Sequence, residues 1–155
     1  MAVDPWFIVS SAPGSAELIR TAREVNDGKP SFIASQVRER AARFRDPVVA
    51  CLGLAFKPDV DDTRESPALK VAMELADSGF ERLLVADPHL SSLPTQLGGR
   101  DNVEFVHVNR AVQEADVLAV LVAHSAFKKI SREEVLRRVV IDASGLFQRL
   151  SDGSA

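Results

Sequence analysis

The sequence predicts an α/β fold: a Rossmann-like, doubly wound parallel sheet of about five strands, preceded by a helical arm. Two observations lead to this prediction. Short apolar runs of strand length alternate with segments whose apolar residues recur at helical spacing, and turn residues separate the two kinds of segment. The longest run, residues 48–56, is almost uninterrupted, as expected of a strand covered on both faces. With 155 residues, the chain is long enough for one domain with a substantial core.

The first 46 residues precede the predicted sheet. Their apolar spacing predicts one helix over residues 15–27 and a second over residues 30–44. Pro30 is costly inside a helix but tolerated in a first turn, so we expect the two helices to be nearly collinear or kinked. We interpret residues 1–46 as a connector or dimerisation arm; ordinary packing helices would give the same pattern.

The chain opens with residues 6–9, Trp-Phe-Ile-Val, which need burial that a free terminus seldom supplies. Either this segment packs on the body, or a preceding part of the protein has been removed. Asp4-Pro5 is typical of a turn.

From residue 47 onward the pattern alternates. We expect strands at residues 48–56, 82–87, 103–107, 117–122 and 139–142. Helices are expected at residues 67–78, ending with Ser78-Gly79, at 109–115 with Asn109 as the N-cap, and between 125 and 138. The sheet domain then spans residues 47–150, and residues 151–155 form a frayed tail.

Composition narrows the class of protein. Nineteen basic and twenty-two acidic residues give a formal charge of -3, which argues against a nucleic-acid binder. The one cysteine, Cys51, lies within an apolar strand, where it cannot form a disulfide framework and is no plausible nucleophile. No apolar run approaches the roughly 18 to 20 residues of a membrane span, and no signal peptide is visible. We expect a cytoplasmic domain.

A charged loop, residues 53–66, joins the first strand to a helix whose start is marked by Ser66-Pro67. Ligands of open α/β sheets bind at this edge, and helix N-termini favour anions. Lys57 could therefore bind a phosphate, and Phe56 could pack on a base. Arg64 could add a bidentate contact, or it could pair with the acidic residues of the loop.

Other candidate sites are weaker. The loop lacks the G-x-G-x-x-G pattern of a dinucleotide site, so we expect no tight NAD site on this sheet. Asp87 could hold a ribose hydroxyl or simply open a turn. His124-Ser125 could contact a ligand or start a helix. His89 and His107 look like isolated surface residues, and no metal-binding spacing is visible.

Residues 53–67, Gly-Leu-Ala-Phe-Lys-Pro-Asp-Val-Asp-Asp-Thr-Arg-Glu-Ser-Pro, closely resemble the signature of the C-terminal, UDP-binding domain of the UDP-glucose/GDP-mannose dehydrogenase family. Residues 2–8 and 18–30 are similar to its UDP-N-acetyl-D-mannosamine dehydrogenase branch, and residues 120–128 and 139–145 agree as well. The resemblance extends from residue 2 to about residue 148.

The resemblance implies a UDP-sugar-binding part of an enzyme that oxidises the C6 alcohol of UDP-N-acetyl-D-mannosamine to UDP-N-acetyl-D-mannosaminuronate with NAD. Phe56 and Lys57 match positions that touch UDP, and Asp4 matches a carboxylate that handles water and protons. Residues 15–44 match the helices that build the homodimer. The nucleophilic cysteine would fall just before Met1 and the NAD domain would be missing. We therefore expect this chain alone to be inactive and to bind no cofactor.

Two departures and two alternatives remain. Residues 144–148 lack the nucleotide-contacting arginine that the family often has there, with Arg149 only nearby. Without the cysteine, Asp4 has no partner. The sheet alone would also suit another nucleotide or NAD, and the arm would suit a purely structural dimerisation piece.

Overall fold

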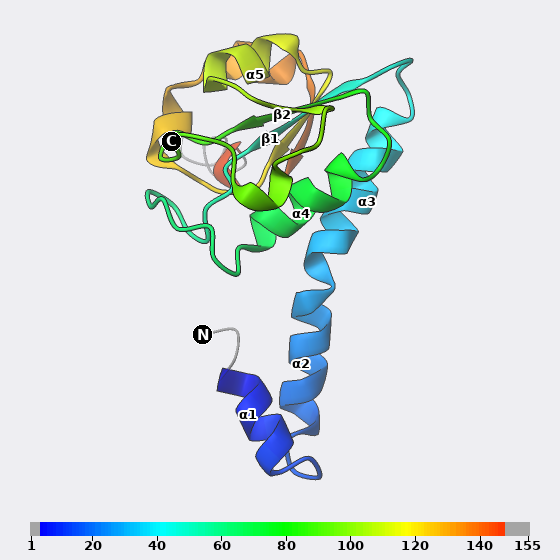
Figure 1. Cartoon of the computed structure of the whole chain (residues 1–155), viewed down its shortest axis with the longest axis vertical. Helices are drawn as coiled ribbons and strands as arrows, with labels where there is room; N and C mark the ends of the chain where they lie inside the picture. The colour runs from blue at the N-terminus through cyan, green and yellow to red at the C-terminus, as the bar shows by residue number, and fades with distance from the viewer. Residues whose placement is uncertain (1–3, 148–155) are drawn as a thin grey trace, which may run out of the picture.

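A computed structural model of the chain describes residues 4–147 and shows a five-stranded parallel sheet (Figure 1). The strand order is β3-β2-β1-β4-β5. The strands are β1 (Val48–Leu52), β2 (Arg82–Ala86), β3 (Val103–Phe105), β4 (Val117–Val120) and β5 (Val139–Asp142). The chain leaves β1 to one side for β2 and later returns to its other side for β4, so the order reverses at β1. This confirms the predicted doubly wound fold and places the switch point between β1 and β4.

Helices cover both faces of the sheet. α3 (Lys29–Ala41) and α4 (Pro67–Ala76) pack on one face, while α5 (Val108–Glu114) and α6 (Arg132–Leu136) pack on the other. The sheet therefore has a hydrophobic core on each face, and successive residues of β1 point into opposite cores. Val49 and Cys51 pack on the side of α3 and α4, whereas Ala50 and Leu52 pack on the side of α5 and α6. Two short 3-10 helices, η1 (Thr95–Leu97) and η2 (Ser125–Lys129), complete the layers.

β1 is shorter than the sequence predicts, and the expected strand over residues 48–56 is wrong at its end. It stops at Leu52 because Gly53 takes a φ of +86°, which turns the backbone out of the extended conformation. Residues 53–55 stay buried although they are no longer strand.

The ends of α4 and α5 (Val108–Glu114) agree only in part with the caps predicted from the sequence. Ser66 is the N-cap of α4 as predicted, accepting the N–H of Leu69. α4 ends earlier than predicted, at Ala76 with Asp77 as its C-cap, and Gly79 follows with a φ of +82°. Asn109 is not the cap of α5, because the ring of His107 accepts the N–H of Asn109 instead.

The N-terminal helices project from the body (Figure 1). The expected turn at Asp4-Pro5 is wrong, since α1 (Asp4–Ser11) already begins there and packs against α2 (Glu17–Asp27). α2 and α3 are nearly collinear, one of the two arrangements expected, because Gly28 keeps helical angles (φ -78°, ψ -12°) between them. Only α3 is built into the body, where it lies against α4 and the sheet.

The arm, α1 and α2, leaves apolar side chains uncovered. No residue of α2 is buried, and the exposed apolar side chains of the N-terminal helices are Trp6, Phe7, Ile8, Leu18, Val25 and Phe32. The sequence left open whether residues 6–9 pack on the body. They lie on the arm instead. No helix among residues 4–147 is long and apolar enough to cross a membrane.

Candidate functional site

Three segments meet at the carboxyl edge of the sheet. The charged loop follows β1, Asp87 follows β2 and His124 follows β4, and β2, β1 and β4 are neighbours in the sheet. Parallel strands bring their carboxyl ends to one edge, so residues far apart in sequence converge here.

Asp87 faces inward and bonds to the start of the charged loop. Its Oδ2 accepts the N–H groups of Leu54 (2.8 Å) and Ala55 (3.2 Å), and its Oδ1 accepts the N–H of His89 (2.9 Å). Its side chain is fully buried. Burial alone would raise the pKa of Asp87, but hydrogen bonds from His124 and these N–H groups outweigh that effect and hold it below its ordinary value. Asp87 is therefore an anion committed to the protein's own backbone.

His124 connects Asp87 to the middle of the charged loop. Its Nε2 lies 3.2 Å from Oδ2 of Asp87, and its Nδ1 accepts the N–H of Asp59 at 3.0 Å. The ring is completely buried and packs edge-on against Phe127. His124 also directly precedes η2, which agrees with the helix-starting role that the sequence allowed, and a ligand contact of His124 stays a prediction.

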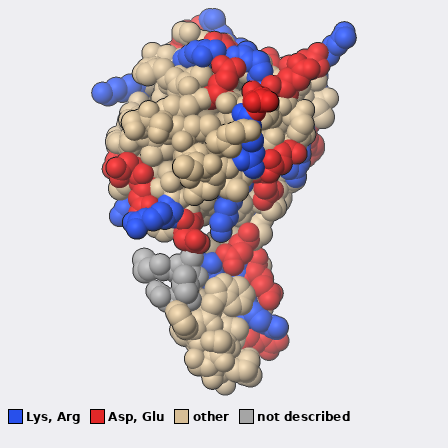
Figure 2. Space-filling model, viewed as in Figure 1, with Lys and Arg blue, Asp and Glu red and all other residues tan. Residues whose placement is uncertain are grey.

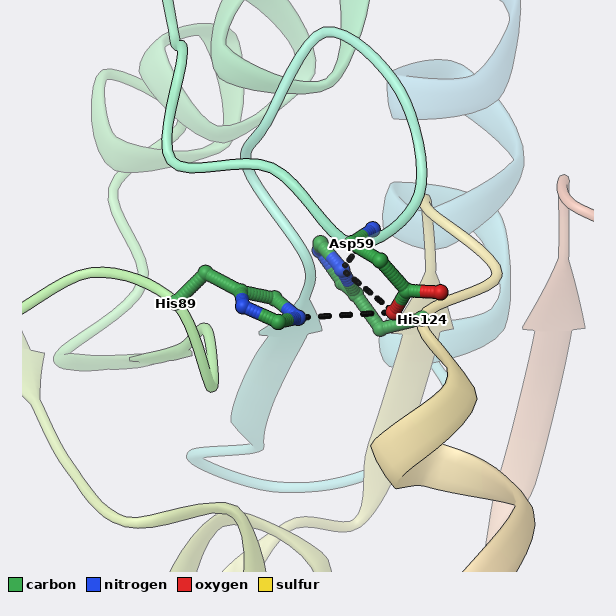
Figure 3. A group of neighbouring side chains, drawn as sticks. All are labelled: Asp59, His89 and His124. Carbon is green, nitrogen blue, oxygen red and sulfur yellow. Dashed lines mark hydrogen bonds and ion pairs between the residues drawn. The ribbon is translucent and has the colours of Figure 1, made fainter.

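The side chain of Asp59, in the charged loop, bonds to Ser125, the residue that follows His124. Its carboxylate accepts the N–H (2.8 Å) and the hydroxyl (2.6 Å) of Ser125, which hold the pKa of Asp59 below its ordinary value. Its Oδ1 also lies 3.4 Å from Nε2 of His89 (Figure 3). His89 is therefore not isolated as predicted, because its ring sits over the loop and 4.9 Å from the ring of His124.

Phe56 and Lys57 lie between these anchors. Both are exposed, and Phe56 lines a cavity of about 180 Å³ with Pro30 and Asp27 at the junction of α2 and α3. Within the described residues, Lys57 forms no salt bridge of 4.0 Å or less. A phosphate could therefore approach its ammonium from solvent.

In this conformation Arg64 pairs with an acidic residue of its own loop. Its guanidinium pairs in bidentate fashion with Asp62, at 2.9 Å and 2.7 Å, and the side chain is 88% exposed. The pair lowers the pKa of Asp62 to about 2. This is the ion pairing that the sequence allowed as the alternative, and the ligand role of Arg64 stays a prediction.

Two predicted positions fall outside what the structure describes. Asp4 begins α1, but its side chain is beyond the described part of the chain, as is Arg149. Their roles stay predictions.

The edge does not fit NAD. The loop after β1 has no glycine-rich turn, and Asp87, the residue placed to hold a ribose, has both oxygens engaged by the protein. Of the two roles that the sequence left open for Asp87, the structure shows the turn, because its Oδ1 accepts the N–H of His89 two residues later.

Asp59, His89 and His124 are the one group among residues 4–147 whose spacing could suit a metal ion. An ion on Nδ1 of His124 would displace the N–H of Asp59, so the observed arrangement is a hydrogen-bonded network rather than a preformed metal site.

Sequence reasoning missed Asp59 and underrated His89 and His124. Asp59 stood out only as one of several acids in the loop. The missing signal was spatial, since the three residues lie at least 30 residues apart in the sequence and meet only through the strand order.

Comparisons with known proteins agree with this geometry. The family model described as the UDP binding domain of the UDP-glucose/GDP-mannose dehydrogenase family matches residues 50–149. An NDP-N-acetyl-D-galactosaminuronic acid dehydrogenase of Ralstonia nicotianae is 46% identical over 95% of this chain and 34% of its own length. A UDP-N-acetyl-D-mannosamine dehydrogenase of Campylobacter jejuni is 46% identical over 88% of this chain and 33% of its own.

A solved structure gives the same result. A UDP-N-acetyl-mannosamine dehydrogenase from Staphylococcus aureus aligns with a TM-score of 0.74 and 32% identity, over 94% of this chain and 34% of that one. The chain thus spans about a third of the length of the relatives it matches. The chain belongs to the UDP-glucose/GDP-mannose dehydrogenase family, and residues 50–149 correspond to its UDP-binding domain.

Proposed function

We propose that this chain is the UDP-sugar-binding and dimerising part of an NAD-dependent UDP-N-acetyl-D-mannosamine 6-dehydrogenase. The observation that carries the proposal is the family match over residues 50–149, which includes the charged loop with Lys57 open to solvent. NAD would serve the parent enzyme through parts outside this chain, and Asp4 would act beside a cysteine that this chain does not contain. The match to a galactosaminuronate dehydrogenase leaves the sugar epimer to experiment.

In this proposal Lys57 neutralises the phosphates and Phe56 packs against the nucleotide. Phe56, the residue before Lys57, lines the same cavity as Pro67 at the N-terminus of α4, and the N–H groups of a helix N-terminus add positive potential. Arg64 does not supply a second positive charge while its guanidinium is paired with Asp62. The binding energy should therefore depend strongly on Lys57.

The test is a thermal-shift titration of the chain with UDP, GDP and NAD. A ligand at one hundred times its dissociation constant stabilises a protein by about 2.7 kcal/mol, which is readily visible. We expect UDP alone to shift the parent, Lys57→Ala to reduce the shift, and Lys29→Ala, an exposed lysine outside the loop, to leave it unchanged. A shift by NAD instead, or by no nucleotide at millimolar concentration, contradicts UDP binding by this chain.

We further propose that the arm joins two copies of the chain. Leu18 and Val25 are 86% and 68% exposed on one face of α2, and Figure 2 shows a largely uncharged surface at the end of the arm. Apolar faces of this kind are covered in stable proteins, and a two-fold pairing would cover the same face on both copies.

Analytical ultracentrifugation tests the pairing. We expect a dimer for the parent, a monomer for Leu18→Glu/Val25→Glu, and a dimer for Arg20→Glu, which changes charge on the opposite face of α2. A monomeric parent at tens of micromolar would rule out the arm as a self-sufficient dimer interface.

A further inference from the structure

We propose that His124, Asp87 and Asp59 form a latch that positions Lys57 for the nucleotide. The inference rests on the proposed function, and it assigns a role to three residues, of which only Asp59 lies in the signature stretch 53–67. The latch is defined by these three residues and their bonds to the charged loop.

The latch fixes the backbone on both sides of Lys57 and makes no bond to the Lys57 side chain. On its N-terminal side, Asp87 fixes the N–H of Ala55, and the carbonyl of Ala55 accepts the hydroxyl of Ser66 at 3.1 Å. On its C-terminal side, His124 fixes the N–H of Asp59. The loop is also closed on itself, because the N–H of Phe56 donates to the carbonyl of Asp62 at 2.7 Å.

The network has one consistent arrangement of protons. A backbone N–H can only donate, so Nδ1 of His124 must be the unprotonated acceptor for Asp59. The ring proton then lies on Nε2 and is donated to the Asp87 carboxylate. His124 is a neutral bridge between a buried anion and the loop.

The close fit of His124 depends on the backbone beneath it. A Cβ on Gly53 would lie 3.2 Å from Cδ2 of His124 and 2.6 Å from Cβ of Val122. The signature glycine therefore lets the segment after β4 approach the start of the loop.

Asp59 completes the latch from the exposed side. Its φ of +59° is unusual for a residue with a side chain, and two bonds to Ser125 hold it in that conformation. Unlike the buried histidine, Asp59 can be changed with little risk to the core, because its side chain is 44% exposed. A loop that is already ordered binds its ligand more tightly, because the entropy cost of ordering the loop no longer opposes binding.

The test measures UDP affinity by calorimetry on this chain, with unliganded melting temperature as the check on folding. We expect Asp59→Ala to weaken UDP binding roughly tenfold, the effect of ordering about one more residue on binding. Asp59→Asn should keep most of the affinity, because asparagine tolerates the same φ and still accepts one Ser125 bond. Asp61→Ala, which removes the same charge from an exposed position of the same loop, should not weaken binding.

Two histidine variants separate the two bonds of the ring. The amide oxygen of His124→Asn can take the place of Nδ1 and keep Asp59, whereas the amide of His124→Gln reaches toward Asp87 only. We expect the asparagine variant to bind UDP more tightly than the glutamine variant. In the parent, nitrogen NMR should show His124 with its proton on Nε2.

The outcomes are distinct. If Lys57→Ala abolishes UDP binding while Asp59→Ala matches the parent within twofold, the latch is refuted and the proposed function stands. A proton on Nδ1 of His124 also refutes it. If the parent binds no UDP, the proposed function fails and the latch fails with it.

Discussion

Replacing Gly53 with alanine tests how closely the charged loop is built into the sheet edge. Two costs follow from the structure. A φ of +86° strains any residue with a Cβ by about 1 kcal/mol, and a Cβ 2.6 Å from Cβ of Val122 forces backbone shifts. Such overpacking typically costs about 1 to 3 kcal/mol. We therefore expect Gly53→Ala to lower the free energy of unfolding by about 2 to 4 kcal/mol.

The matched control is Gly79→Ala. Gly79 has almost the same φ, +82°, but a Cβ there would meet nothing within 4 Å. It should lose only the strain, about 1 kcal/mol. Urea unfolding followed by circular dichroism gives both values, and the melting temperature of Gly53→Ala should fall by roughly 5 to 15 °C. Equal losses in the two variants would refute the close contact between Gly53 and the segment after β4.

Three further predictions concern buried groups. Burial raises the pKa of the Cys51 thiol to about 12, so Ellman's reagent should label the chain only above its unfolding midpoint; rapid labelling of the native chain would contradict this. The pKa of Asp87 is lower in the folded than in the unfolded state, so its ionisation contributes stability that is present above the ordinary value of 3.8 and is lost as pH falls below it. The free energy of unfolding of the parent should therefore fall more steeply in acid than that of Asp87→Asn, and parallel pH profiles would argue against a buried carboxylate anion. Ser66→Ala removes the cap of α4 and leaves the carbonyl of Ala55 without its hydroxyl partner, and it should cost about 1 to 2 kcal/mol in urea unfolding; a neutral substitution would show that neither bond matters.

Patterns with strong local causes could be predicted from the sequence. The five strands and their order along the chain follow from apolar runs that must be covered on both faces, and Ser66-Pro67 marks a helix start by its own capping chemistry. A helix start at Pro30 could also be predicted, because its ring is compatible with a first helical turn. Lys57 could be proposed as a ligand residue because its place after a buried strand depends on chain order alone, and that role stays a prediction.

Other features depend on contacts between distant segments, and these the tertiary structure decided. β1 ends at Leu52 rather than near residue 56 because Gly53 must make room for Val122 and His124, which lie about 70 residues away in sequence. Asp87 could have been a ribose ligand or a turn residue. Its bond to the N–H of His89 agrees with the turn, and only its bonds to the N–H groups of Leu54 and Ala55 show that it also holds the charged loop. In the same way, His124 and Asp59 carry no local signal of their joint role. Local propensities determined the elements of this protein, whereas the strand order, which no short stretch of sequence encodes, determined which side chains meet.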